Sequence, residues 1–208
     1  MSDSPTTGKV SWKRFAAVMV PSTLAVGALV FGTASGAIAA TFAVSGNAFK
    51  VSADKIEADG FTQYGSAVQK GDGTLVPVTN AVINQAKITK MCQSVTQDFF
   101  GKKITLRLEA GPNESNKVVA DHLTMGIDSL KADAVFSDIK IGMDASKLDA
   151  AKIGDGGKWD AAPVGQAGAF GQQATSAVLT KVQQSAWSTT AGTFNLKGLT
   201  MSFGAECY

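Results

Sequence analysis

The chain has 208 residues, of which 45% are apolar, and a formal net charge of +2 at pH 7. That charge belongs to the N-terminus: residues 1–39 hold three of the 19 basic and one of the 17 acidic residues, which leaves 16 of each sign in residues 40–208. A neutral body of this length can bury one substantial core but lacks the basic surface that nucleic-acid binding requires. The composition therefore predicts one domain and no nucleic-acid partner.

The N-terminal region predicts export from the cytoplasm. Residues 15–38 carry no charge and follow a basic cluster within residues 9–14. Their length exceeds the roughly 20 residues that span the hydrocarbon core of a bilayer. Because positive charge before such a segment favours a cytoplasmic N-terminus, the chain divides into a cytoplasmic tail at 1–14, a membrane segment at 15–38 and an exported domain at 40–208.

A retained membrane anchor is one interpretation of this segment. Its interface residues would be Trp12, Lys13 and Arg14, because aromatic and basic side chains flank spanning helices. Gly32 and Gly36 have the G-x-x-x-G spacing that lets two membrane helices approach closely. The protein would then stay in the cell membrane with its body outside the cytoplasm.

A cleavable export signal is the other interpretation. The segment has a basic start, an apolar middle and small residues at Ala37 and Ala39, an A-x-A pattern after which a signal peptidase cuts. Cleavage near Ala39 would release the body as a secreted protein. In either case the domain that follows is exported.

Two cysteines, Cys92 and Cys207, both lie in the predicted exported domain. An oxidising compartment lets a disulfide persist, so a bridge between them is expected, with two buried free thiols as the alternative. The bridge would close a loop of over a hundred residues, which the chain-entropy model values at about 4.7 kcal/mol. Neither cysteine has a C-x-x-C partner or a neighbouring histidine, so no zinc or redox site is predicted.

Short runs of period-two alternation dominate the exported domain and indicate strands. The clearest runs occupy residues 49–53, 56–58, 104–110, 123–127, 130–134, 139–143, 194–196 and 199–203. Changes of phase near Ser129, Ser137 and Gly198 predict bulges or tight corners, which bend a sheet. The Gly-Asp-Gly sequence at 71–73 predicts a hairpin turn before a further strand at 74–78.

This pattern predicts a mainly β fold, namely a curved antiparallel sheet, sandwich or barrel with one or two short helices, after an N-terminal transmembrane or signal helix. A β-solenoid is the alternative, because Asp128, Asp133 and Asp138 recur at five-residue intervals. The apolar residues between these aspartates do not keep that period, which favours the antiparallel sheet.

Helix is expected in only a small part of the chain. Residues 172–187 predict an amphipathic helix, because apolar residues recur there at a spacing of four. These residues are Ala174, Val178, Val182 and Ala186. A second short helix is expected at 145–153, with Leu148 and Ala151 facing the core. The stretch 154–171, rich in Gly and Ala, predicts a long loop pinned by Trp159 and Phe170.

Candidate catalytic chemistry is sparse. His122 is the only histidine and follows Asp121, so a serine–histidine–aspartate site would have to use it, yet no G-x-S-x-G nucleophile elbow accompanies it. The glycine-rich stretches at 71–73 and 154–157 lack the ligand pattern of a phosphate or calcium site. The sequence therefore predicts no catalytic residue, no metal site and no cofactor. Asn113 begins a glycosylation sequon in an expected turn.

Several segments point together to one family. They are the basic and apolar N-terminus, residues 42–61, residues 91–95, residues 168–173 and the terminal Glu206-Cys207. The chain resembles exported, membrane-anchored actinobacterial envelope proteins of unassigned function. The resemblance implies a Gram-positive cell envelope and a family-typical cysteine pair that matches Cys92 and Cys207. Some members carry the label cholesterol esterase, which the missing nucleophile elbow does not support here.

We expect a non-enzymatic cell-envelope protein whose exported β-rich domain binds lipid or a protein partner or self-assembles. The expected partners are the membrane, a lipid ligand, and a second copy of the chain or another envelope protein. Neutral net charge permits self-association, which strong charge would oppose. A secreted lipid-ester hydrolase that uses His122 is the alternative from another class.

Overall fold

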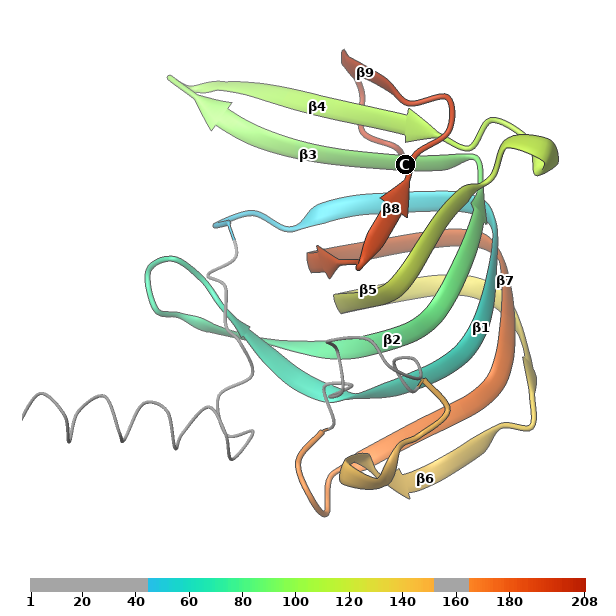
Figure 1. The fold of residues 1–208 in the computed structure, drawn as a ribbon. Coiled ribbons are helices and arrows are strands. Elements are labelled where there is room, and N and C mark those ends of the chain that lie inside the picture. The colour runs from blue at the N-terminus through green and yellow to red at the C-terminus, as the bar shows by residue number, and fades with distance from the viewer. Residues whose placement is uncertain (1–44, 152–164) are drawn as a thin grey trace, which may run out of the picture. The chain divides into compact units, whose positions relative to one another are not determined.

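The computed structural model describes residues 45–151 and 165–208, and most of this part of the chain is β-strand (Figure 1). The strands are β1 (Phe49–Gln69), β2 (Leu75–Thr89), β3 (Met91–Phe99), β4 (Lys102–Ala110), β5 (Val118–Ser137), β6 (Lys140–Asp144), β7 (Phe170–Thr190), β8 (Thr193–Asn195) and β9 (Thr200–Phe203). Two short 3-10 helices are η1 (Glu114–Asn116) and η2 (Ala145–Lys147). The strands form one sheet in the order β6-β7-β5-β2-β1-β3-β4-β9, with β8 beside β5.

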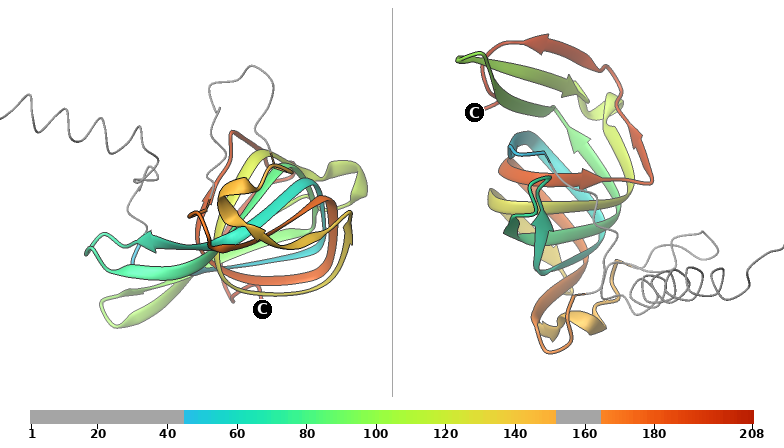
Figure 2. Two further views of the ribbon diagram at one scale, coloured as in Figure 1. Left: turned by 90° about the horizontal axis from the view of Figure 1, so that it is seen from below. Right: turned by 90° about the vertical axis from the view of Figure 1, so that its left-hand side faces the viewer.

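Four long strands curl this sheet into a partial ring (Figures 1 and 2). β1 pairs with both β2 and β7, and β5 also pairs with both β2 and β7. In β5, residues 118–127 lie along β2 and residues 124–137 lie along β7. The predicted curved antiparallel sheet is confirmed. The solenoid alternative is wrong, because the pairings among the described strands are antiparallel.

Single residues with a left-handed backbone change which side chains of a long strand face the core. In β5, the buried Ala120 precedes His122, whose φ is 54°, and the buried Leu123 follows it. Lys181, with a φ of 53°, lies between the buried Leu179 and Val182 of β7. At Lys181 the pairing of β7 with β5 also changes register, as in a β-bulge, whereas the pairing of β5 with β2 keeps its register across His122. A bulge bends a strand and increases its twist, so a strand of 21 residues can follow the ring.

The predicted corners and turn are confirmed. The pairing of β5 with β7 changes register next to Ser129, and β5 ends at Ser137 before a corner in which Asp138 has a φ of 50°. Gly198, with a φ of 67°, lies in the turn between β8 and β9. The turn at 71–73 joins β1 to β2 as a hairpin.

The predicted helix at 172–187 is wrong, since these residues form most of β7. A spacing of four is close to the helical period of 3.6, but it is also twice the strand period of two, so it does not distinguish the two structures. β7 is hydrogen-bonded along β1 on one side and along β5 on the other. Pairing with strands that are distant in sequence therefore decides its conformation.

The second predicted helix, at 145–153, is observed only as the three-residue turn η2. Asp144 caps this turn, and its Oδ1 accepts a hydrogen bond from the Ser146 backbone N at 2.9 Å. Leu148 and Ala151 are buried, as the helix prediction required of them. The orientation of these side chains was therefore predicted correctly on an incorrect backbone.

The predicted loop at 154–171 is described only from residue 165, and Trp159 lies outside the described residues. Residues 165–169 form a turn that leads into β7. Phe170 is the first residue of β7 and is 62% exposed, so the prediction that it pins the loop to the body is wrong.

Two apolar clusters stabilise the domain. The larger one faces the inside of the ring and includes Phe61, Ile83 and Leu123. The smaller one lies on the opposite face of the sheet, because Val82 and Ile83 are neighbours in β2 and point to opposite sides. Its buried members are Tyr64, Val82, Ala145, Leu148 and Ala151.

Side chains of the sheet fix the segment that covers the smaller cluster. Gln173 Oε1 accepts hydrogen bonds from the backbone N of Asp149 at 2.7 Å and of Ala150 at 3.2 Å. Asn84 Nδ2 donates to the Ala150 carbonyl at 3.3 Å. These contacts satisfy backbone groups that a helix would have paired internally, which explains why the segment needs no helix.

Candidate functional site

Strands β3, β4 and β9 form an extension of the sheet beyond the ring (Figures 1 and 2). β3 continues the line of β2 along β1 in the same register, after a kink at Lys90 with a φ of 50°. Only residues 50–52 of β1 pair with β3. Beyond Ser94, β3 is therefore paired with β4 alone, and the β3–β4 hairpin projects away from the ring.

One face of the extension is apolar. Leu106 of β4 lies directly between Val95 of β3 and Phe203 of β9, and Leu108 lies beside Met201. Side chains alternate between the two faces of a sheet, so these residues share a face. We call it the apolar face, and its members are Val95, Ile104, Leu106, Leu108, Met201 and Phe203.

The apolar face is open to solvent along β9 and the outer part of β4. Phe203 is 76% exposed, Met201 59% and Ile104 40%. At its inner end the face is continuous with the core, since the buried Met91 and Ala110 are paired across β3 and β4. A contiguous exposed apolar surface of this kind is uncommon on soluble domains and usually marks an interaction site.

A small opening into the ring lies beside the inner end of this face. Most of the residues that line this opening are apolar, among them Met91, Leu123, Met125 and Phe194, and Gln93 is a polar one. Gln93 is the neighbour of Leu108 in the β3–β4 pairing, so the opening and the apolar face meet there.

The other face of the extension is polar, and the C-terminal tail covers part of it. Cys207 is bonded to Cys92 with a Cα–Cα distance of 5.8 Å, and its backbone N donates to Ser94 Oγ at 3.1 Å. Lys50 Nζ contacts the Glu206 carboxylate at 2.7 Å and so lowers the Glu206 pKa. The predicted disulfide is confirmed. The tail thus shields polar side chains while the apolar face stays open.

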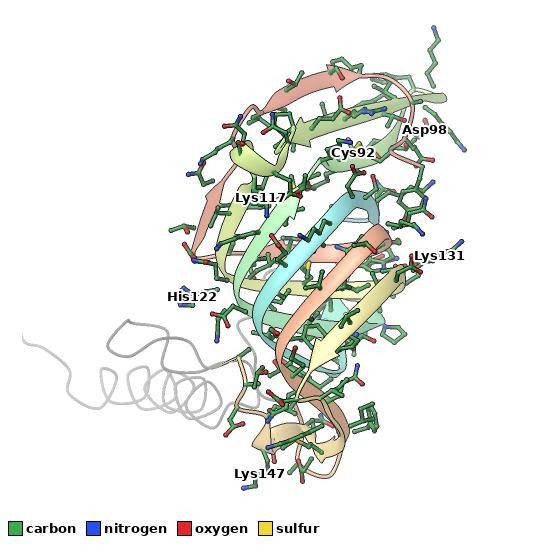
Figure 3. All side chains as sticks on the ribbon, turned by 90° about the vertical axis from the view of Figure 1, so that its right-hand side faces the viewer. Cys92, Asp98, Lys117, His122, Lys131 and Lys147 are labelled. Atoms are coloured by element: carbon green, nitrogen blue, oxygen red, sulfur yellow. A yellow bond between two sulfur atoms is a disulfide. The ribbon has the colours of Figure 1, made fainter. Side chains whose placement is uncertain are left out.

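The Asp121 carboxylate is hydrogen-bonded to residues other than His122. Asp121 Oδ1 accepts from Gln85 Nε2 at 2.9 Å, and its Oδ2 accepts from Thr193 Oγ1 at 2.5 Å. Figure 3 shows His122 pointing away from the sheet, and no hydrogen bond joins its ring to any described residue. The carboxylate therefore holds β8 against β5 and does not orient the imidazole.

Asp121 gives the domain a predicted sensitivity to acid. Hydrogen bonds from Thr193 and then Gln85 hold its pKa below the ordinary value of 3.8, so the ionised form stabilises the fold above pH 3.8 and this contribution is lost as pH falls through the lower native pKa. Asp121→Asn is expected to lower the free energy of unfolding at pH 7 by about 1 kcal/mol. Urea unfolding at pH 7 and pH 3 should show the difference from wild type shrinking at pH 3, with Asp59→Asn, at an exposed position of β1, as the control. An equal difference at both pH values would contradict this role.

The other predicted turns are structural where they are described. Asp72 Oδ1 accepts from the Thr74 backbone N at 2.9 Å and closes the β1–β2 hairpin. Asn113 caps η1 by accepting from the backbone N of Ser115 and Asn116. Within residues 45–151 and 165–208, no group of three or more His, Cys, Asp or Glu side chains is arranged to hold a metal ion.

The predicted membrane residues lie outside the described part of the chain. This applies to the cleavage position near Ala39 and to Trp12, Lys13, Arg14, Gly32 and Gly36. Among the residues that are described, no helix has the length and apolar character to cross a membrane.

The apolar face was not among the sites predicted from the sequence. The signal was present, because residues 104–108 and 199–203 both alternate and the second run lies just before Cys207. Alternation shows that a strand has an apolar face, but it does not show whether another segment covers that face.

Comparisons with known proteins add one match. A family model described as a family of unknown function (DUF6230) matches residues 45–208. The search of curated proteins and the search of solved structures found no match. The match agrees with the expected membership of a family without an assigned function, while the envelope location stays a prediction.

Proposed function

The chain belongs to a family of unknown function, DUF6230, whose model covers residues 45–208, and we propose that it is a non-enzymatic cell-envelope protein that binds lipid on the apolar face of its β3–β4–β9 extension. The observation that carries this proposal is the exposure of Ile104, Met201 and Phe203 side by side on a face continuous with the core. Burying one such side chain against a ligand contributes about 1.5–3 kcal/mol.

The chemistry of the face favours an acyl chain as the ligand. Its six side chains are all apolar, and Gln93 and Gln97 of β3 on the same side are uncharged, while the charged Lys102 lies only at the outer end, opposite Phe99. A ligand that lies along the face therefore needs neither charge nor regularly spaced hydrogen-bonding groups. The void beside Gln93 is only about 20 Å³, so the acyl chain would lie along the face and would not enter the core.

Self-assembly is the second candidate, and one observation favours it. β9 is the last strand in the order of the described sheet, so its outer edge is available for pairing. Edge strands of this kind can pair with a second copy of the chain. The lipid-ester hydrolase is weaker, because the Asp121 carboxylate that it would use is engaged by Gln85 and Thr193.

A paired substitution on β9 tests the lipid proposal. Met201→Ser with Phe203→Ser is expected to weaken binding of a fluorescent fatty acid to the full chain by at least about tenfold, because two large apolar contacts are lost. The control is Val135→Ser, which removes an apolar side chain that is 70% exposed on β5, outside the extension. Circular dichroism checks that both variants are folded.

Native mass spectrometry of the same proteins separates the candidates. Lipid bound to the wild type and to Val135→Ser, but not to the β9 variant, would support the proposal. Equal fatty-acid binding by all three proteins would contradict it. A lipid-free dimer that the β9 variant loses would replace it with self-assembly through β9.

A further inference from the structure

The outer end of the extension carries two exposed aromatic side chains. Phe100 is 104% exposed and Phe99 is 49% exposed, at the turn that joins β3 to β4. Phe99 lies opposite Lys102 in the pairing, and Phe100 and Gly101 form the turn itself. We call residues 99–103 the tip.

The backbone at the tip makes the choice of phenylalanine unexpected. Phe100 has a φ of 54° and Gly101 a φ of 78°, which is the left-handed conformation of a two-residue hairpin turn. Asn, Asp and Gly adopt this conformation readily, whereas a bulky residue there is an outlier. The turn is already closed by Asp98 Oδ1, which accepts from the Gly101 backbone N at 2.8 Å. Phe100 is therefore strained, exposed and unnecessary for the turn.

Two lysines complete the tip. Lys102 and Lys103 are exposed, and neither forms a salt bridge with a described residue. They project to opposite faces of β4, on either side of the turn that carries Phe100. Aromatic rings with lysine around them suit the boundary of a bilayer, where the ring enters the acyl region and the ammonium group meets phosphate.

We propose that the tip inserts into the surface of a membrane that contains anionic phospholipid, with Phe99 and Phe100 in the acyl boundary and Lys102 and Lys103 on the headgroup phosphates. The position of the tip supports this, because the hairpin projects beyond the ring and ends in these residues, as Figures 1 and 2 show. Figure 3 places Asp98, which closes the turn, at the outer end of the extension. The cost of a strained, exposed phenylalanine is then offset by contact with lipid.

The test needs a local probe, because the predicted apolar segment at 15–38 could carry the whole chain to vesicles by itself. Phe100→Cys is labelled with an environment-sensitive nitrobenzoxadiazole dye in the full chain. The two native cysteines are joined to each other, so the dye attaches to the new thiol. Val135→Cys, at an exposed position on β5, is the matched control.

On vesicles of phosphatidylglycerol and phosphatidylcholine, the dye at position 100 should shift to shorter wavelength and be quenched by spin-labelled lipid, while the dye at position 135 should not. Replacing Lys102 and Lys103 by Gln should reduce the shifted fraction at least threefold. A dye at position 100 that stays in water overturns the proposal. An equal shift on pure phosphatidylcholine overturns the assignment of the lysines to anionic headgroups.

Phe100→Asn separates insertion from folding. Asparagine tolerates the left-handed turn, so the thermal midpoint should be unchanged or higher, while vesicle contact measured with a dye at position 99 should fall at least threefold. A lower midpoint would show that Phe100 serves the fold and would overturn the proposal. The β9 variants test fatty-acid binding by the apolar face, and the tip variants test membrane insertion. One proposal can therefore fail while the other holds.

Discussion

Replacing Cys92 and Cys207 together by serine is expected to lower the free energy of unfolding by about 4 kcal/mol. The bridge joins residues separated by 115 positions, and a cross-link of that span removes much of the freedom of the unfolded chain. In a domain of this size the loss corresponds to a fall of about 10 °C in thermal midpoint. It is the largest effect of any substitution that we predict.

The same variant should also release the tail from the extension. Cys207 holds Glu206 beside Lys50 and the Cys207 backbone against Ser94, so amide hydrogen exchange should rise in residues 200–208 before the rest of the domain opens. Urea unfolding and exchange of the full chain measure both effects. Wild type under reducing conditions should match the double serine variant. A loss below about 1 kcal/mol would show that the tail is held without the bridge.

Gly60→Ala is expected to cost about 3 kcal/mol, from backbone strain and overpacking together. Gly60 has a φ of +65°, and a Cβ there would lie 2.3 Å from Asn84 Nδ2 and 2.6 Å from the carbonyl O of Ala150. The Ala150 carbonyl is backbone and cannot simply rotate away. The substitution should therefore push the segment 145–151 off the sheet and uncover the smaller apolar cluster.

A second glycine provides the matched control for this prediction. Gly73 has a φ of +86°, but a Cβ there would have no atom within 4 Å, so Gly73→Ala should show backbone strain alone, about 1 kcal/mol. Urea unfolding gives the free energy of unfolding of each variant. The difference between the two losses is the cost of the contact between a Cβ at position 60 and the Ala150 segment. Equal losses would mean that the segment yields easily and that its docking contributes little.

Local patterns predicted much of the sheet. The alternation at 104–110 predicted most of β4, and the changes of phase near Ser129, Ser137 and Gly198 predicted a bulge and two corners. These features depend on the chemistry of a few consecutive residues, which a sequence displays directly. The helix prediction at 172–187 failed for the opposite reason. A spacing of four fits a helix and a strand equally, and only pairing with β1 and β5 decides the conformation of this segment.

The sequence by itself determined a mainly β domain of zero net charge and two cysteines suited to a bridge, because composition and alternation are properties of the chain alone. The tertiary structure decided which surfaces remain exposed to solvent. The tail held by Cys207 covers part of the polar side of β3 and β4, while Met201 and Phe203 lie on the other side beside the half-buried Leu106 and stay exposed. Exposure depends on segments that are far apart in sequence and meet only in the fold, so alternation within one strand cannot predict it.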